Sequence, residues 1–277
     1  MFHVKHVRLS FAGKPLARII AITNQKGGVG KTTTAINLAA ALAASDLKVL
    51  IIDADPQGNT TSGLGIEKTD GMPTLYDILV HARSACDAVR KTEMDGLEIL
   101  PADKNLIGVN VDLVSREDRE SQLRRGLEVL GKDYQFILID CPPALDLLTL
   151  NALVSADSIL IPIQCEFFAL EGVSGLMDTI DRVRDSFGHS LQIEGILLTM
   201  YDERTNLTKQ VAADLREFFG DEVFRTVIPR SIRLAEAPSH GKPILLYDPG
   251  SKGSEAYIQL AKEILTNEQK RFAKSAR

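Results

Sequence analysis

The chain has 277 residues, of which 44% are hydrophobic and 25% are charged, and its formal net charge is −5. This length supports one large α/β domain with a sizeable core, and the acidic balance excludes attraction of nucleic acid by overall charge alone. The three cysteines, Cys86, Cys141 and Cys165, form no C-x-x-C pair, so neither a disulfide framework nor a zinc site is predicted. The sequence shows no long apolar run of the kind that spans membranes or directs secretion, so we expect a cytoplasmic protein with no membrane partner.

Short apolar runs alternate with helical patterns along the chain. Alternation of this kind predicts an α/β fold, with a mostly parallel, twisted sheet covered by helices on both faces. We expect strands at residues 17–24, 49–53, 97–101, 136–140, 158–163, 192–199 and 222–227. We expect helices between them, including residues 32–44, 116–130, 170–186, 207–219 and 254–265.

A phosphate-binding loop follows the first predicted strand, with the sequence NQKGGVGKTTT at residues 24–34. Its end fits the pattern G-x-x-x-x-G-K-[ST], but Gln25 stands where the first glycine belongs, and Lys26 adds a second lysine. Glycines let backbone N–H groups approach phosphates closely, and the following helix adds the positive end of its dipole. We predict nucleotide contacts from Lys26, Gly27, Gly28, Val29, Gly30, Lys31, Thr32 and Thr33.

Three aspartates lie at the carboxyl ends of predicted strands, where open α/β sheets hold their ligands. Asp53 and Asp55 follow the strand at 49–53, and Asp140 ends the strand at 136–140 before Cys-Pro-Pro. We predict that Thr32, Asp53 and Asp140 serve a Mg²⁺ site, and that Lys31 binds the β- and γ-phosphates of ATP. An aspartate in this place can also end a strand or cap a helix, and for Asp53 that alternative stays open.

The motifs KGGVGKTTT, DADPQGN and DCPP, with IPRSIRLAEAPSHGKP at residues 228–243, resemble the ParA/Soj partition ATPases. This group has a deviant Walker A motif and is related to MinD. The resemblance runs from about residue 17 to about residue 265 and implies a single-domain P-loop NTPase fold. We therefore predict three parts: a flexible N-terminal extension at residues 1–16, an ATPase domain at 17–266 and a basic tail at 267–277.

The same resemblance implies roles for individual residues. Lys26 would reach the nucleotide of a partner subunit in an ATP-sandwich homodimer, and Asp55 would orient or activate the attacking water. Together with Lys31, these two residues form the predicted catalytic set. The resemblance places the adenine site near Asn206, Pro229 and Arg230.

Partition would require contact with DNA and with a second protein. The resemblance places Arg204 and Arg233 on a DNA-contacting surface, where phosphate contacts would be independent of sequence and sensitive to salt. The alternative is a solvated face without DNA. The resemblance also implies a nucleoid-associated protein that is released when a ParB-type partner stimulates hydrolysis.

The main alternative is a MinD-like ATPase that positions a membrane or protein cargo. Membrane binding of that kind needs an amphipathic C-terminal helix, and residues 267–277 are basic with Phe272 as their single large apolar residue. An iron-protein-like reductase would need cysteines that bridge a cluster, for which Cys141 is weak support. A scaffold that binds ATP without hydrolysing it is disfavoured by the presence of Lys26 and Asp55.

The first six residues permit codons that spell TGTTTCACGTGAAACA, a perfect palindrome. It resembles the parS site that ParB partners bind. We therefore predict that the start of the gene overlaps a parS site, or that these codons were taken into the protein from one. Synonymous codons that break the palindrome would contradict both alternatives.

Overall fold

The computed structural model describes residues 17–130, 133–166, 169–188 and 190–275, and the predicted extension at 1–16 lies outside them. Within these residues one sheet of eight strands has the order β3-β4-β2-β5-β1-β6-β7-β8. Neighbouring strands run parallel, except that the short edge strand β3 is antiparallel to β4. The strands are β1 Arg18–Ile22, β2 Val49–Asp53, β3 Arg90–Lys91, β4 Leu97–Leu100, β5 Phe136–Asp140, β6 Ser158–Gln164, β7 Gln192–Tyr201 and β8 Val223–Pro229.

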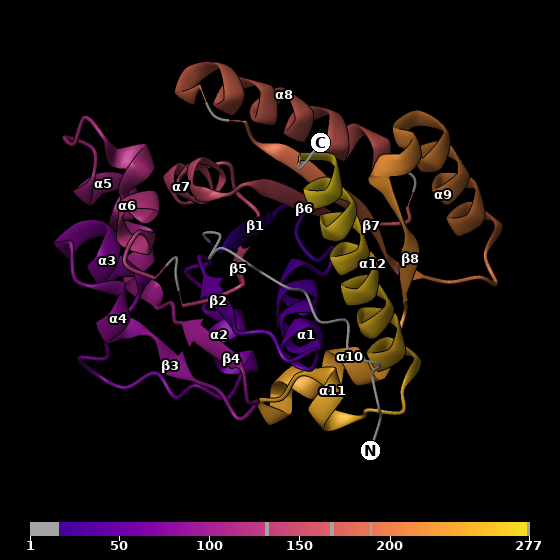
Figure 1. The fold of residues 1–277 in the computed structure, drawn as a ribbon, viewed down its shortest axis with the longest axis horizontal. Coiled ribbons are helices and arrows are strands. Elements are labelled where there is room, and N and C mark those ends of the chain that lie inside the picture. The colour runs from indigo at the N-terminus through magenta and orange to yellow at the C-terminus, as the bar shows by residue number, and fades with distance from the viewer. Residues whose placement is uncertain (1–16, 131–132, 167–168, 189, 276–277) are drawn as a thin grey trace.

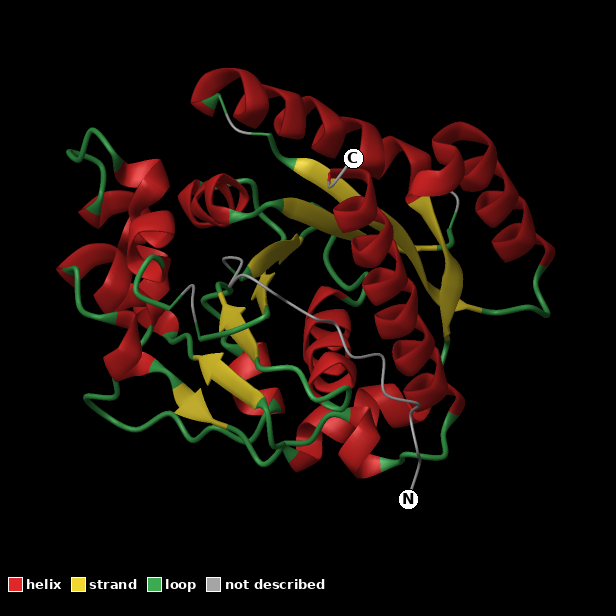
Figure 2. Ribbon diagram, viewed as in Figure 1, coloured by secondary structure: helices red, strands yellow, loops and turns green. Residues whose placement is uncertain are grey.

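Helices cover both faces of this sheet, as Figures 1 and 2 show, with α1 and α12 on one face and α7 and α8 on the other. Short 3₁₀ turns at residues 104–108, 119–121, 220–222 and 237–240 connect some of the elements. The helices are α1 Lys31–Ala43, α2 Asn59–Gly63, α3 Leu75–His81, α4 Ala85–Ala88, α5 Val109–Asp112, α6 Gln122–Leu127, α7 Leu147–Ser155, α8 Ala169–Phe187, α9 Asn206–Phe219, α10 Ile232–Glu236, α11 Ile244–Tyr247 and α12 Lys252–Ser275.

The central strands are buried on both faces, and alternate residues enter two different cores. Leu50 and Ile52 of β2 pack in the core beneath α7 and α8, whereas Val49 and Ile51 pack in the core beneath α1 and α12. A strand whose side chains alternate between two apolar environments reads as a continuous apolar run. This confirms the predicted α/β class with helices on both faces.

Two predicted helices have different bounds in the structure. Within the range 116–130, α6 spans only Gln122–Leu127, and in its first turn Leu123 N donates to the Asn151 side chain on α7 (3.1 Å). At the other end of the chain, α12 continues past residue 265 to Ser275, so no helix end marks the predicted tail boundary. None of the described helices combines the length and apolarity needed to cross a membrane.

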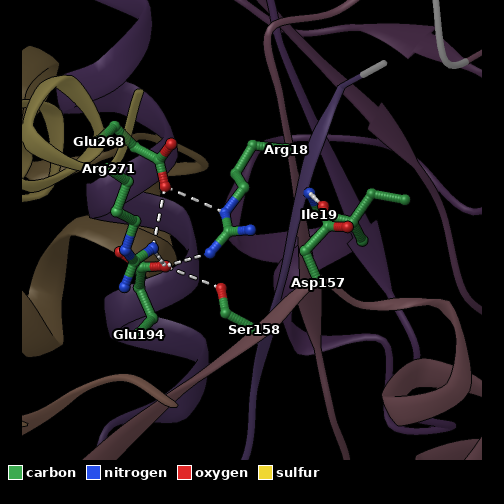
Figure 3. Close-up of polar contacts among 7 residues, drawn as sticks. All are labelled: Arg18, Ile19, Asp157, Ser158, Glu194, Glu268 and Arg271. Carbon is green, nitrogen blue, oxygen red and sulfur yellow. Dashed lines mark hydrogen bonds and ion pairs between the residues drawn. The ribbon is translucent and has the colours of Figure 1, made fainter. Parts of the chain in front are cut away.

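A buried ionic cluster fastens the end of α12 to the amino edge of the sheet (Figure 3). Glu194 Oε2 on β7 accepts hydrogen bonds from Arg18 Nη2 (2.9 Å), Arg271 Nη1 (2.7 Å) and Ser158 Oγ (2.8 Å). Both arginines also reach Glu268 Oε1 on α12, at 3.1 and 2.9 Å. The cluster therefore joins β1, β6, β7 and α12, and it explains why α12 stays ordered beyond the predicted end.

The charge of Glu194 is the centre of this cluster. Burial alone would raise the pKa of Glu194, but the guanidinium groups of Arg271 and Arg18 hold it below the ordinary value. A carboxylate with a lowered pKa stabilises the fold above the pKa of the unfolded chain, about 4.3, and loses that contribution as the pH falls through its own folded pKa.

We predict that Glu194→Ala lowers the free energy of unfolding by about 3–5 kcal/mol at pH 7, because it leaves two partly buried arginines with one remaining carboxylate. The measurement is chemical denaturation at pH 7. As a control, Asp87→Ala removes the partner of Arg83 in an exposed i,i+4 pair and should change stability very little. Equal effects of the two substitutions would contradict the structural role of the cluster.

Candidate nucleotide and metal site

The loop between β1 and α1 has the backbone geometry of a phosphate-binding loop. Gly28 and Gly30 adopt left-handed conformations, with φ of 75° and 89°, that side chains with a Cβ rarely adopt. Gly30 precedes α1 and offers no side-chain cap, so the first N–H groups of the helix are available to phosphate oxygens. A Cβ added at Gly27 or Gly28 would meet nothing within 4 Å, so the loop faces open space.

Lys31 is the buried cation of this loop. Its Nζ donates to the backbone oxygen of Lys26 (3.0 Å). The loop is also held by Thr199 Oγ1 on β7, which donates to Val29 O (2.8 Å). Burial lowers the pKa of Lys31, and the carboxylates of Asp140 and Asp55 partly offset this effect. The residue is thus positioned to exchange a backbone carbonyl for phosphate oxygens.

Asp140, the last residue of β5, is fully buried, as is Asp53. Its Oδ2 accepts hydrogen bonds from Thr32 Oγ1 (2.8 Å) at the start of α1 and from Thr60 Oγ1 (2.7 Å) in α2. Its Oδ1 is also buried and has no hydrogen-bond partner among the described residues. Burial raises the pKa of Asp140 to about 7, and the neighbouring charge of Asp53 adds to that rise.

Asp53 ends β2 directly beside Asp140 in the parallel register. Its Oδ2 accepts hydrogen bonds from the N–H (2.8 Å) and the hydroxyl (2.7 Å) of Thr61. Burial raises the pKa of Asp53 to about 6, although the hydrogen bonds from Thr61 oppose this effect.

The oxygen atoms at this edge of the sheet suit a magnesium ion. Mg²⁺ prefers carboxylate, hydroxyl and water oxygens, and the edge offers two carboxylates and the Thr32 hydroxyl. The unpartnered Oδ1 of Asp140 is the strongest sign of fit, because a buried carboxylate oxygen without a donor is costly unless a cation or its bound water satisfies it. The structure thus brings Asp140 and Thr32 together, and Asp53 lies beside them.

Asp55 lies two residues beyond β2, in a tight loop that is half-buried. Its N–H donates to Asp53 Oδ1 (3.2 Å), and its own Oδ1 accepts a hydrogen bond from Gln57 N (2.9 Å). The backbone carbonyl oxygen of Asp55 also closes the turn by accepting a hydrogen bond from Gly58 N (2.8 Å). The loop therefore holds the Asp55 carboxylate close to Asp53 without burying it fully. A residue that orients a water molecule needs this access to solvent.

The side chain of Lys26 is more exposed than that of Lys31 and has a different partner. Its ammonium group forms an ion pair with Glu166, just after β6, and both side chains remain more than a third exposed. The preceding loop is fixed by Asn24, whose Oδ1 accepts from Lys26 N (3.0 Å) and whose Nδ2 donates to Pro162 O (2.8 Å). The second lysine of the motif is thus an exposed cation at the rim of the loop.

The predicted adenine residues lie on the β7–β8 side of the same sheet edge. Asn206 begins α9 after the end of β7, and Pro229 ends β8 opposite Tyr201. Arg230 N donates to Tyr201 O (3.1 Å), which joins the two strand ends. Since Thr199 of β7 also contacts the phosphate loop, these residues share one edge with the nucleotide site.

The two predicted DNA-binding arginines are on the surface, and each pairs with nearby carboxylates. The Arg204 side chain is 86% exposed and donates to both oxygens of Asp202, at 2.8 and 2.7 Å. Arg233 on α10 pairs with Glu236 (3.0 Å) and Asp248 (3.5 Å). Any phosphate that these arginines bind must therefore compete with a carboxylate.

Sequence reasoning missed four residues that shape the site: Thr60, Thr61, Glu166 and Thr199. The two adjacent threonines follow the DADPQGN motif closely, and hydroxyls so near two aspartates were a signal that could have been used. No local pattern marks Glu166 or Thr199, because each contacts the phosphate loop from a segment that is distant in the chain.

Comparison with known proteins agrees with this geometry. A family model described as an AAA domain matches residues 17–193. The chain is 54% identical to the chromosome partitioning protein ParA of Caulobacter vibrioides over 94% of this chain and 98% of that protein. It is 53% identical to the sporulation initiation inhibitor protein Soj of Bacillus subtilis over 91% of this chain and all of that protein.

Among solved structures, cobyrinic acid a,c-diamide synthase from Mycobacterium smegmatis with bound ADP and magnesium has the same fold. Its TM-score is 0.79 at 35% identity, over 95% of this chain and 97% of that chain. The sequence motifs, the P-loop geometry and these similarities together show that the chain belongs to the ParA/Soj family of chromosome-partitioning ATPases.

Proposed function

We propose that the protein hydrolyses ATP as a sandwich dimer, binds double-stranded DNA without sequence preference in that state, and is released when a ParB-type partner stimulates hydrolysis. Such a cycle would drive chromosome or plasmid segregation and would make the protein cytoplasmic and nucleoid-associated. The observation that carries the ATPase part is the buried Asp140, which joins the phosphate loop to the metal edge of the sheet.

ATP is the nucleotide and Mg²⁺ the metal in this proposal. The loop at Gly27 to Thr33 would hold the triphosphate, while Thr32, Asp140 and Asp53 would hold Mg²⁺, which neutralises phosphate charge during transfer. Asp55 would orient the attacking water, since it lies exposed enough to contact solvent and is fixed by Gln57 and Asp53. The adenine would lie toward Asn206, Pro229 and Arg230.

The exposed position of Lys26 supports a role between subunits. Lys31 already supplies a buried cation to the chain's own loop, whereas the Lys26 ammonium lies at the rim and pairs with Glu166. A partner's triphosphate would compete with Glu166 for this lysine, and a cation supplied in trans can accelerate phosphoryl transfer by about 10³–10⁵-fold. ATP would then act as both substrate and part of the dimer interface.

DNA binding in the proposed dimer would use Arg204 and Arg233. Both side chains are exposed, and both can exchange their carboxylate partners for phosphate oxygens. Binding to phosphates alone is independent of base sequence and weakens as salt rises.

The first prediction from the proposed function concerns the phosphate loop. Lys31→Ala should weaken ATP binding by at least about tenfold, because a hydrogen bond to a charged group contributes about 1.5–3 kcal/mol. Fluorescence titration with a labelled ATP analogue measures this. Lys48→Ala, which alters an exposed lysine before β2, should bind like the parent. Unchanged affinity of Lys31→Ala would refute the loop assignment.

The second prediction separates binding from chemistry. Asp55→Ala should bind ATP and dimerise, but its turnover should fall by about 10²–10⁴-fold if Asp55 orients or activates the water. Phosphate release gives the rate, and light scattering with ATP gives the dimer. A normal rate would remove Asp55 from the proposed mechanism.

The third prediction tests the DNA surface with random-sequence duplex DNA, in ATP and in ADP, over a salt series. The parent should bind only with ATP, and Arg233→Glu should lose that binding while it still dimerises. The slope of log affinity against log salt should fall by about one for each lost phosphate contact.

The matched control is Arg83→Glu, which reverses another surface arginine that pairs within its own segment. If Arg233→Glu keeps the affinity and salt slope of the parent, the DNA surface is wrongly placed. If the parent binds no DNA in either nucleotide state, the DNA part of the proposal fails, and binding to anionic liposomes would then test the MinD-like alternative.

A further inference from the structure

Two adjacent threonines fasten the short helix α2 to the metal edge of the sheet. Thr60 donates its hydroxyl to Asp140 Oδ2 (2.7 Å), and Thr61 donates its N–H and hydroxyl to Asp53 Oδ2. Both threonines are fully buried. Each therefore contacts one of the two strand-end aspartates.

The two oxygens of Asp140 are in different states because of these contacts. Oδ2 accepts two hydroxyl hydrogen bonds, one from Thr32 on α1 and one from Thr60 on α2, whereas Oδ1 is buried without a partner among the described residues. Two donors from different elements on one oxygen restrict rotation of the carboxylate. The orientation of Oδ1 is thereby set before any cation binds.

The loop with Asp55 is tied at both ends to the same pair of aspartates. At its start, Asp55 N donates to Asp53 Oδ1 (3.2 Å), and its end runs directly into Asn59 and Thr60. Thr61 Oγ1 further accepts a hydrogen bond from Ala102 N (3.0 Å), which anchors α2 to the segment after β4. Thr60 therefore connects Asp140 to the end of the loop that carries Asp55.

We propose that Thr60 is a positioning residue for the magnesium site. Its hydroxyl orients the Asp140 carboxylate toward the metal and couples that orientation to the loop that carries Asp55. This inference rests on the proposed function, in which Mg²⁺ and ATP occupy the site. Thr60 touches neither, and it acts through Asp140.

The test is the magnesium dependence of nucleotide binding by the full chain. ATP affinity is measured first in EDTA and then as Mg²⁺ is added stepwise. Thr60→Val keeps the shape of the side chain and removes its hydroxyl. It should leave affinity in EDTA unchanged and raise the half-saturating Mg²⁺ concentration by about 10–100-fold, the usual cost of losing a group that orients a metal ligand.

Conservative and control variants separate positioning from general destabilisation. Thr60→Ser restores the hydroxyl and should recover most of the magnesium affinity. If Thr60→Val folds poorly, Thr60→Ala takes its place and should show the same rise in the half-saturating Mg²⁺ concentration. The matched control is Thr34→Val, which removes another fully buried hydroxyl, whose partner is Tyr257 OH (3.3 Å) on α12 and not one of the aspartates. Its half-saturating Mg²⁺ concentration should equal that of the parent.

The outcomes distinguish this inference from the proposed function. If the parent binds Mg²⁺ and ATP normally and Thr60→Val or Thr60→Ala does too, the positioning role is wrong and the proposed function stands. An equal shift in Thr34→Val, or no recovery in Thr60→Ser, would also overturn it. If ATP binding by the parent does not depend on Mg²⁺, the metal site itself is wrong, and the inference fails with it.

Discussion

The buried carboxylate of Asp140 is the constraint on which the rest of the site depends. It ends a central strand, accepts hydrogen bonds from α1 and α2, and lies beside Asp53 in the register of β2 and β5. A buried carboxylate needs donors or a cation, because isolated charge in a dry interior is costly. The threonines supply donors to Oδ2, and Oδ1 has no hydrogen-bond partner among the described residues, so it is available to the proposed metal. The phosphate loop, the metal edge and the Asp55 loop are thus connected through one side chain.

The opposite, amino edge of the sheet is fixed by another buried carboxylate, that of Glu194. Glu194 joins β1, β6, β7 and α12 through Arg18, Ser158 and Arg271, as Figure 3 shows. Glu194 and Asp140 differ in which groups compensate their negative charge. Protein cations satisfy Glu194, and its pKa falls, whereas no cation of the chain contacts Asp140 in the described residues, and its pKa rises. The first arrangement favours rigidity of the frame, and the second favours binding of an external cation.

Local sequence predicted the central strands and the phosphate loop well, because both depend on short-range patterns. The strands at 49–53 and 136–140 were predicted at their observed bounds, since burial on both faces makes them apolar at every position. The same continuous apolarity concealed α7, whose sequence LLTLNALVS has no polar face to give a helical period. The edge strand β3 has only two residues, and the contacts of Thr60 and Glu166 depend on the assembled sheet.

The surface charges suggest why DNA binding would depend on dimerisation. The net charge is −5, and carboxylates already pair with both Arg204 and Arg233. When a phosphate replaces Asp202 or Glu236, the free energy gained is only the difference between the two ion pairs. That difference is small at an exposed position. One chain would therefore offer only weak contacts to DNA. The proposed dimer would present two sets of arginines to one duplex, and the second set would bind at high effective concentration. In this way ATP could switch DNA binding on without any change in the arginines themselves.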